Sequence, residues 1–383
     1  MDIKTICIHG SKKSFDYTGA VSTPIFQSAT FIHPAVGQST GYDYSRQQNP
    51  TREVLEDTVA RLEDGIDALA FSSSMAAISL VMELFSPDAH IIASDDLYGG
   101  THRLFSFVSE KNGISISLAN TSVLEEVEAA ITSKTRAIFI ETPTNPMMHV
   151  TDIAAVAKIA RQHNLLLIVD NTFLTPYFQK PLLLGADIVM HSGTKYLCGH
   201  NDTLSGFLVV KDAELSEKLR FLYKTIGACL SPFDSWLLLR SIKTLPVRLE
   251  QQQQSAVKIA QWLLTQKSIV AVHYPGLKTH PQYDISQRQT SGFGAMISFE
   301  VDSAAKAVQI LEQVKLIQYA ESLGGVESLI TYPMLQTHAD IPEKEREAKG
   351  ITNRLLRLSV GLESCGDLLE DLDQAINGKS GNV

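Results

Sequence analysis

The sequence has 383 residues, of which 44% are hydrophobic and 20% are charged, and its formal net charge is −9. This length and apolar content predict a globular protein with two or three domains. The acidic balance, without a dense block of Lys or Arg, argues against nucleic acid as a partner. The first residues lack the apolar core of a signal peptide and no apolar run reaches membrane-spanning length, so we expect a cytoplasmic protein with no membrane partner.

Residues 1–48 are rich in Ser, Thr, Gly and Tyr and show little helical periodicity, which predicts an extended N-terminal arm. A helix is predicted to follow. Asn49 can accept the free N–H groups of a first turn, Pro50 suits the first helical position, and Gly65 can end the helix.

Residues 49–246 alternate between apolar, strand-like runs and helical segments such as 75–85 and 152–164. Near-continuous apolar strands separated by helices are typical of a mostly parallel sheet covered on both faces, so the pattern predicts an α/β core. The predicted strands are 68–72, 90–94, 137–141, 165–170, 187–192 and 206–210.

Residues 247–383 are predicted to form a smaller α+β domain. A long helical stretch leads into it, with a bend expected at Pro246. Strand-like runs at 295–301, 328–333 and 355–363 follow, mixed with helices.

The four cysteines are scattered and form no C-x-x-C pair, which argues against a zinc site and a disulfide framework. We therefore expect reduced thiols and no metal.

Polar side chains follow several of the predicted strands, where ligands bind in an open parallel sheet. They are Tyr98, Asn145, Asp170, Ser192, Thr194 and Lys195. In addition, the hydroxyl-rich run 72–75 opens a helix, whose unpaired N–H groups favour an anion such as phosphate.

A lysine, a carboxylate, an aromatic and an anion cradle are the groups that pyridoxal phosphate requires. Taken singly, each has an ordinary explanation: Lys195 as a surface charge, Asp170 as a helix cap, Tyr98 as an aromatic at the edge of the core. The signatures of competing cofactors, G-x-G-x-x-G after a strand, the P-loop and H-E-x-x-H, are missing. The joint placement of these residues therefore favours pyridoxal phosphate.

The run from Glu141 to Asp202 closely resembles the Cys/Met-metabolism (trans-sulfuration) family of pyridoxal phosphate enzymes, which includes cystathionine γ-synthase, cystathionine γ-lyase and cystathionine β-lyase. The similarity extends over nearly the whole chain, with TGAVSTPIFQSATF, GYDYSRQQNPTR, DLYGGTHRLF, AESLGGVESLITYP and LLRLSVGLE as further matching stretches. It implies the aspartate-aminotransferase-type fold (PLP fold type I), small amino-acid substrates, and a homotetramer built from active dimers.

The resemblance also implies roles for residues around the cofactor. Lys195 matches the lysine that forms a Schiff base with it, Asp170 the partner of the pyridinium nitrogen, and Tyr98 the aromatic stacked on the ring. The implied phosphate ligands are Ser192, Thr194 and the main-chain N–H groups near Ser74 and Met75. Because the family usually has Gly where this chain has Ser74, we expect the turn to need a positive φ from serine.

Other matched residues involve the neighbouring subunit and the substrate. Tyr44 and Arg46 match a pair that reaches the phosphate from the neighbouring subunit. Arg357 matches the arginine that binds the substrate α-carboxylate, a task suited to its planar fork. The implied lining of the same pocket comprises Asn145, Ser322 and Glu321.

The resemblance leaves the reaction open. Glu321 resembles γ-synthases and γ-lyases more than β-lyases. γ-Replacement of an O-acyl-homoserine by cysteine or sulfide comes first, because the segments GHND, FDSWLLLR and ITYP…QTHADIP look most similar to bacterial γ-synthases or acylhomoserine thiol-lyases. γ-Elimination of cystathionine is the alternative. Gly100 stands where methionine γ-lyases typically carry Cys, which argues against a methionine γ-lyase. An aminotransferase or a non-catalytic regulator would be the remaining classes.

Overall fold

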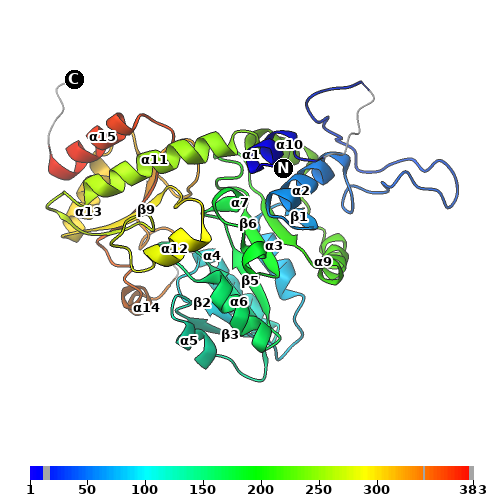
Figure 1. Cartoon of the computed structure of the whole chain (residues 1–383), viewed down its shortest axis with the longest axis horizontal. Helices are drawn as coiled ribbons and strands as arrows, with labels where there is room; N and C mark the ends of the chain where they lie inside the picture. Colours follow the sequence, from blue (N-terminus) through cyan, green and yellow to red (C-terminus); the bar gives the residue numbers. More distant parts are fainter. Residues whose placement is uncertain (12–17, 340, 379–383) are drawn as a thin grey trace.

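A computed structural model describes residues 1–11, 18–339 and 341–378 (Figure 1). Within these residues the strands form two sheets, one of seven strands and one of five. The seven-stranded sheet is built from residues 67–210 and the five-stranded sheet from residues 269–359. The predicted α/β class, with a smaller α+β part toward the C-terminus, is confirmed.

The seven-stranded sheet has the strand order β1-β7-β6-β5-β4-β2-β3. Only β7 runs antiparallel to its neighbours β1 and β6; the pairs from β6 to β3 are parallel. The strands are β1 (Asp67–Phe71), β2 (His90–Ser94), β3 (Ser115–Ala119), β4 (Thr135–Glu141), β5 (Leu166–Asp170), β6 (Ile188–Ser192) and β7 (Gly206–Val210). The six predicted strands are confirmed to within two residues, and β3 was missed.

Helices cover both faces of this sheet. Apolar residues of α2, α6 and α8 pack on one face, and those of α3 and α9 pack on the other. The helices up to this point are α1 (Ile3–His9), α2 (Pro50–Leu62), α3 (Ser74–Met82), α4 (Gly99–Arg103), the π-helix η1 (Leu104–Ser109), α5 (Leu124–Ala129), α6 (Ile153–Gln162), α7 (Thr175–Phe178), α8 (Pro181–Leu184) and α9 (Ala213–Ile226). As predicted, Asn49 caps α2, where its side chain accepts the N–H groups of Thr51 and Arg52.

The N-terminal arm is not extended throughout, because residues Ile3–His9 form the helix α1. Asp2 caps α1, and Ile6 and Cys7 on its inner face are buried. A seven-residue helix with only two buried positions gives a weak periodic signal, which explains why the sequence pattern did not reveal it. Residues 18–48 have the expected irregular, extended character and project away from both sheets (Figure 1).

The predicted bend at Pro246 is a complete break between two helices, α10 (Pro232–Ile242) and α11 (Leu245–Leu263). Proline has no N–H to donate to the carbonyl four residues earlier, which is that of Ile242, so one continuous helix cannot form there. Pro246 instead lies in the first turn of α11, where that N–H would be unpaired anyway.

The five-stranded sheet has the strand order β10-β11-β12-β9-β8. Its strands are β8 (Ile269–His273), β9 (Met296–Val301), β10 (Gln318–Tyr319), β11 (Leu329–Thr331) and β12 (Leu355–Ser359). The accompanying helices are α12 (Tyr283–Gln289), α13 (Ala304–Gln313), α14 (Glu343–Ala348) and α15 (Cys365–Asn377).

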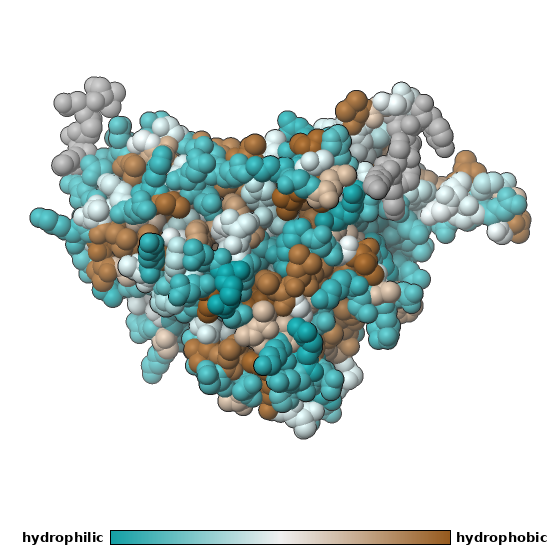
Figure 2. Space-filling view, viewed as in Figure 1, coloured by the Kyte–Doolittle hydropathy of each residue, from teal (hydrophilic) through white to brown (hydrophobic). Residues whose placement is uncertain are grey.

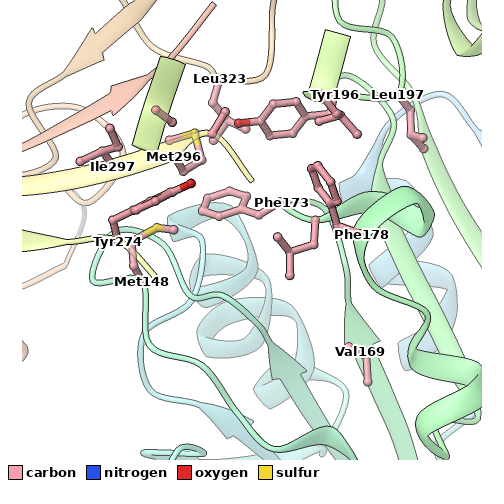
Figure 3. Packing of buried hydrophobic residues seen from close by; sticks show 14 of the residues in the cluster. Met148, Val169, Phe173, Phe178, Tyr196, Leu197, Tyr274, Met296, Ile297 and Leu323 are labelled. Carbon is pink, nitrogen blue, oxygen red and sulfur yellow. The ribbon is translucent and has the colours of Figure 1, made fainter. Parts of the chain in front are cut away.

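The two sheets share one hydrophobic core. A single cluster of buried side chains joins strand residues such as Val169 of β5 to Met296 and Ile297 of β9. Figure 3 shows Phe173, Tyr274 and their neighbours filling the region between the two parts. Such a packed junction resists sliding of one part against the other, so side chains from both sheets can form one well-defined site. No helix in the described part of the chain combines the length and apolar character needed to cross a membrane.

Candidate active site

A cavity of about 210 Å³ lies where the carboxyl ends of β4, β5 and β6 face β12 and the segment before β11. It brings together eleven of the thirteen residues selected from the sequence. They are Ser74, Met75, Tyr98, Asn145, Asp170, Ser192, Thr194, Lys195, Glu321, Ser322 and Arg357. These eleven residues supply an amine, two carboxyl groups, a guanidinium and several hydroxyl groups.

One end of the cavity is formed by the first turn of α3. Ser73 caps this helix, and its side chain accepts the N–H of Ala76 at 3.1 Å. The preceding N–H groups have no partner within a helix and favour an anion, so this end fits a phosphate group. The expectation of a positive φ at Ser74 is wrong, because Ser74 is the first residue of the helix and is not among the residues with positive φ.

Gly206, at the start of β7, lies very close to the main chain of the first turn of α3, and this contact requires glycine at position 206. A Cβ atom added there would lie 2.4 Å from the carbonyl oxygen of Ser73 and 2.6 Å from Cα of Ser74. Both are main-chain atoms of the first turn of α3, so the turn would have to move.

We expect Gly206→Ala to lower the free energy of unfolding by about 1–3 kcal/mol and to weaken retention of a phosphate-bearing cofactor. Denaturant unfolding and equilibrium dialysis would measure the two effects. Gly366→Ala is the matched control: it lies in α15 with only the Ser364 side chain near its Cβ, at 3.6 Å, and should unfold no more easily than the parent. A Gly206→Ala protein that binds cofactor normally would contradict this account of the turn.

Lys195 lies in the turn after β6 and extends into the cavity, where its Nζ donates to Oγ of Ser322 at 3.0 Å. Burial lowers the pKa of its amine to about 8, and the nearby Arg357 guanidinium acts in the same direction. The Glu321 carboxylate opposes the shift. A substantial fraction of the amine is therefore neutral near pH 8, the form that acts as a nucleophile or base.

This pKa shift predicts a pH-dependent cost in stability for the cofactor-free protein. Below pH 8 the lysine is charged in both the folded and unfolded states, and the buried charge costs at most about 3 kcal/mol. The cost decreases between pH 8 and the ordinary value of 10.5, because the folded state releases its proton first. Lys195→Met should therefore be more stable than wild type at pH 7, by a margin that shrinks by pH 10.5. Urea unfolding at several pH values tests this, and a constant margin would contradict it.

Asp170 ends β5 and presents its carboxylate to the same cavity. Its Oδ1 accepts the main-chain N–H of Thr172 at 3.0 Å and the Thr172 hydroxyl at 2.5 Å. Burial raises the pKa of Asp170, while the Thr172 hydrogen bonds and the more distant His191 oppose the increase. A cationic ring nitrogen in the cavity would stabilise the ionised form further.

Arg357 on β12 is 1% exposed and has no acidic partner within ion-pair distance among the described residues. It donates to Oδ1 of Asn145 at 2.7 Å, to the Ser322 carbonyl at 2.9 Å and to the Thr331 hydroxyl at 3.1 Å. Its Nε is buried without a hydrogen-bond partner. Burial lowers the pKa of this guanidinium to about 10, and a buried cation of this kind favours an anionic ligand such as a carboxylate.

The sequence analysis missed several residues that line the cavity, and two of them, Glu141 and Thr172, form hydrogen bonds with residues that it selected. Glu141, the last residue of β4, lines the cavity and accepts the main-chain N–H of Tyr98 at 3.1 Å. Thr172 supplies both hydrogen bonds to Asp170 described above. Glu141 could have been found by the rule that selected Asp170, since each is an acidic residue that ends a buried parallel strand.

Tyr44 and Arg46 do not reach this cavity within their own chain. Arg46 donates to the main-chain carbonyl of Lys224, near the end of α9, and its guanidinium lies over the Tyr44 ring at 5.6 Å from the centroid. The arm that carries them exposes several apolar side chains, including Ile32 and Val36. Figure 2 shows hydrophobic surface near the tip of the projecting arm. An exposed apolar arm of this kind is a surface suited to contact with another protein chain.

Among the described residues, no group of three or more His, Cys, Asp or Glu side chains is arranged to hold a metal ion. Cys198, in the turn after Lys195, is buried, and its Sγ contacts Oδ1 of Asp202 at 3.1 Å outside the cavity lining.

Comparison with known proteins agrees with this geometry. The model of a family described as Cys/Met metabolism PLP-dependent enzyme matches residues 4–377. The chain is 50% identical to a cystathionine gamma-lyase of Bacillus subtilis, covering 98% of this chain and 99% of that protein. It is also 50% identical to a cystathionine gamma-synthase/O-acetylhomoserine (thiol)-lyase of the same organism, covering 95% and 93%.

Similarity to solved structures extends over the same length. The crystal structure of cystathionine gamma-lyase from Lactobacillus plantarum, complexed with L-serine, superposes with a TM-score of 0.96 at 46% identity, covering 98% of this chain and 99% of that one. A cystathionine beta-lyase of Lactococcus lactis is 48% identical over 98% of this chain and 99% of its own length. Relatives with three different reaction names are thus almost equally similar to this chain.

Proposed function

Since the chain belongs to the Cys/Met metabolism family of PLP-dependent enzymes, we propose that it catalyses γ-replacement, in which cysteine or sulfide displaces the acyl group of an O-acyl-homoserine. With cysteine the products are cystathionine and the free carboxylic acid. The observation that supports chemistry at Cγ is the position of Glu321. This carboxylate lines both the cavity that contains Lys195 and an adjoining cavity of about 460 Å³.

The cavity fits pyridoxal phosphate. We assign cofactor attachment to Lys195, contact with the ring nitrogen to Asp170, and ring stacking to Tyr98. The phosphate would be held by the first turn of α3, with Ser74 and Met75, and by Ser192 and Thr194. The close packing at Gly206 supports this assignment, because it keeps the N–H groups of that turn at the cavity wall.

Pyridoxal phosphate, when bound, withdraws electron density from the α-carbon of an amino acid and so makes its protons acidic. Arg357 binds the substrate α-carboxylate, supported by Asn145 and Ser322, and thereby orients the Cα–H bond. Once displaced by the substrate amine, the amine of Lys195 would take the Cα proton, pass that proton to the cofactor and, neutral again, take a proton from Cβ. The electron pair left at Cβ would expel the acyl group from Cγ as a carboxylate, and the thiol would then add at Cγ while protons return to Cβ and Cα.

Glu321 suits the ammonium group of the incoming cysteine. Its position between the two cavities puts a negative charge on the side from which a second amino acid can enter. The same contact would serve the far amino group of cystathionine, so it supports reaction at Cγ in either direction.

γ-Elimination of cystathionine is the second candidate function. The relative named cystathionine gamma-lyase is as similar to this chain as the relative with the synthase name. Water would then replace the thiol as the final reactant, and the products would be cysteine, 2-oxobutanoate and ammonia.

Product analysis of the purified enzyme distinguishes these reactions. We expect cystathionine to form from O-acetyl- or O-succinyl-homoserine and cysteine faster than 2-oxobutanoate is released from cystathionine. Faster release of 2-oxobutanoate would make γ-elimination the main activity. Pyruvate from cystathionine would indicate β-elimination, and turnover that requires a 2-oxo acid acceptor would indicate an aminotransferase.

We further propose that Tyr44 and Arg46 complete the phosphate site of a second copy of the chain. Their distance from their own cavity and the exposed apolar side chains of the arm support this arrangement. A dimer, and a tetramer of two such dimers, would follow. Sedimentation of the purified protein tests it, and a catalytically active monomer would contradict it.

A further inference from the structure

A second carboxyl group lies beside Asp170 on the cavity wall. Glu141 ends β4 as Asp170 ends the adjacent parallel strand β5, and the two residues are direct partners in the strand register. Parallel strands lie only about 4.8 Å apart. Glu141 is 6% exposed and Asp170 is 7% exposed, so neither carboxyl group is well solvated.

The surroundings of Glu141 do not favour a second negative charge. Among the described residues, no Lys, Arg or His lies within ion-pair distance of it. The charged groups that face it are Asp170, Asp96 and Arg357. Burial and the neighbouring Asp170 raise the pKa of Glu141 well above its usual value, and the Arg357 guanidinium offsets only part of this increase.

Hydrogen bonding decides which of the two carboxyl groups keeps the proton. Asp170 accepts two hydrogen bonds from Thr172, and donors of this kind stabilise the ionised form. Glu141 accepts one, from the main-chain N–H of Tyr98. Two carboxylates that share a poorly solvated site cannot both ionise readily, so the one with fewer donors holds the proton.

The neutral carboxyl group of Glu141 also fixes the position of the Tyr98 main chain. Tyr98 precedes α4 as its N-cap residue, and its side chain makes no capping hydrogen bond. Its main-chain N–H is held by Glu141, which lies on the rigid end of a central strand. The placement of the aromatic ring at the cavity therefore depends on this carboxyl group.

We propose that Glu141 is a positioning residue whose neutral carboxyl group holds the main chain of Tyr98 and leaves Asp170 as the only ionised acid beside the cofactor ring. This inference rests on the proposed assignment of Asp170 and Tyr98 to the cofactor. It adds a second acid, with a different protonation state, to the site.

Two substitutions separate the two parts of the proposal. Glu141→Gln keeps an acceptor oxygen and a neutral group of similar shape, whereas Glu141→Leu removes the acceptor. The visible absorbance of the bound cofactor changes with pH as the nitrogen joined to Lys195 gains a proton. We expect the midpoint of this titration in Glu141→Gln to stay within about 0.3 pH unit of wild type. If Glu141 were ionised in the wild type, its replacement by Gln would remove a negative charge and lower the midpoint by about one pH unit. That result would overturn the proposal.

Kinetics test the positioning role. Glu141→Leu should lower kcat about tenfold or more, with KM changed less than about threefold, and Glu141→Gln should restore kcat to within about threefold of wild type. Glu141→Leu with the wild-type kcat would overturn the positioning role. Glu128→Gln, a change at an exposed acid on α5, is the matched control and should behave as wild type.

Infrared spectroscopy of the cofactor-free protein gives a readout that does not depend on activity. The difference spectrum between wild type and Glu141→Gln should contain the carbonyl stretch of a protonated carboxyl group. A carboxylate band in its place would contradict the neutral state. If the wild-type protein shows no cofactor absorbance that titrates, the assignment of the site itself has failed, and the infrared result still reports on Glu141.

Discussion

Replacing Lys195 with alanine should abolish most of the activity. Loss of a positioned general acid–base group alone lowers kcat by about 10²–10⁴-fold, and loss of the cofactor attachment adds to this. The structure gives the reason, because the Lys195 amine extends into the cavity and burial favours its neutral, reactive form. Steady-state rates with saturating cofactor would measure the effect.

Lys218→Ala is the matched control for this experiment. Lys218 is an exposed lysine on α9 that pairs only with Glu214, at 2.7 Å, among the described residues. Its removal should leave the rate and the cofactor absorbance unchanged. A Lys195→Ala enzyme that keeps more than about a tenth of the wild-type rate would contradict the assignment.

Arg357→Leu should produce the second large effect, mainly as an increase in KM for the amino-acid substrate. Leaving a buried carboxylate without its charged partner costs about 2–5 kcal/mol, which corresponds to a fall in kcat/KM of roughly 30-fold to several thousand-fold. Arg357→Lys should lose less, because an ammonium retains the charge but lacks the planar fork. Initial rates over a range of substrate concentrations separate KM from kcat.

The neighbouring Arg354→Leu is the control for Arg357. Arg354 lies three residues earlier and outside the cavity lining, and among the described residues its one ion pair is with the Glu300 carboxylate, at 3.7 Å. Thermal unfolding of both variants shows whether a change in KM reflects misfolding. Equal losses in the two variants, or an unchanged KM in Arg357→Leu, would count against a carboxylate-binding role.

The sequence was sufficient to predict most of the large sheet. Its strands are buried on both faces and therefore appear as continuous apolar runs, which are easily recognised. The missed strand β3 lies at the sheet edge, and only its last residue, Ala119, is buried, so the run SISLA carries little signal. α1 was missed for a related reason, since it buries only two side chains.

Part of the candidate site could be predicted because one rule, polar residues at the carboxyl ends of parallel strands, selects residues that the fold brings to the same edge. Glu321, Ser322 and Arg357 lie outside this rule and were implied only by the family resemblance. The conformation of Ser74 could not be predicted in the same way. Its expected positive φ came from a glycine in related chains, whereas here the close approach is provided by Gly206, 132 positions later in the sequence. Packing between distant segments of this kind has no local signature.

Other features remain predictions. The domain boundary near residue 246 coincides with the start of α11, but the shared core joins the two parts on either side of it. The roles of Tyr44 and Arg46 require a second copy of the chain, which one sequence or one protomer does not contain. The choice between a thiol and water as the final reactant depends on rates rather than on which residues line the cavity.

Borohydride reduction of the cofactor-loaded protein, followed by peptide mass mapping, tests the central claim most directly. The account predicts one modified peptide, which contains Lys195 and carries the mass of the reduced pyridoxyl phosphate group. A label on any other lysine, or no label on a protein that has bound the cofactor, would contradict it.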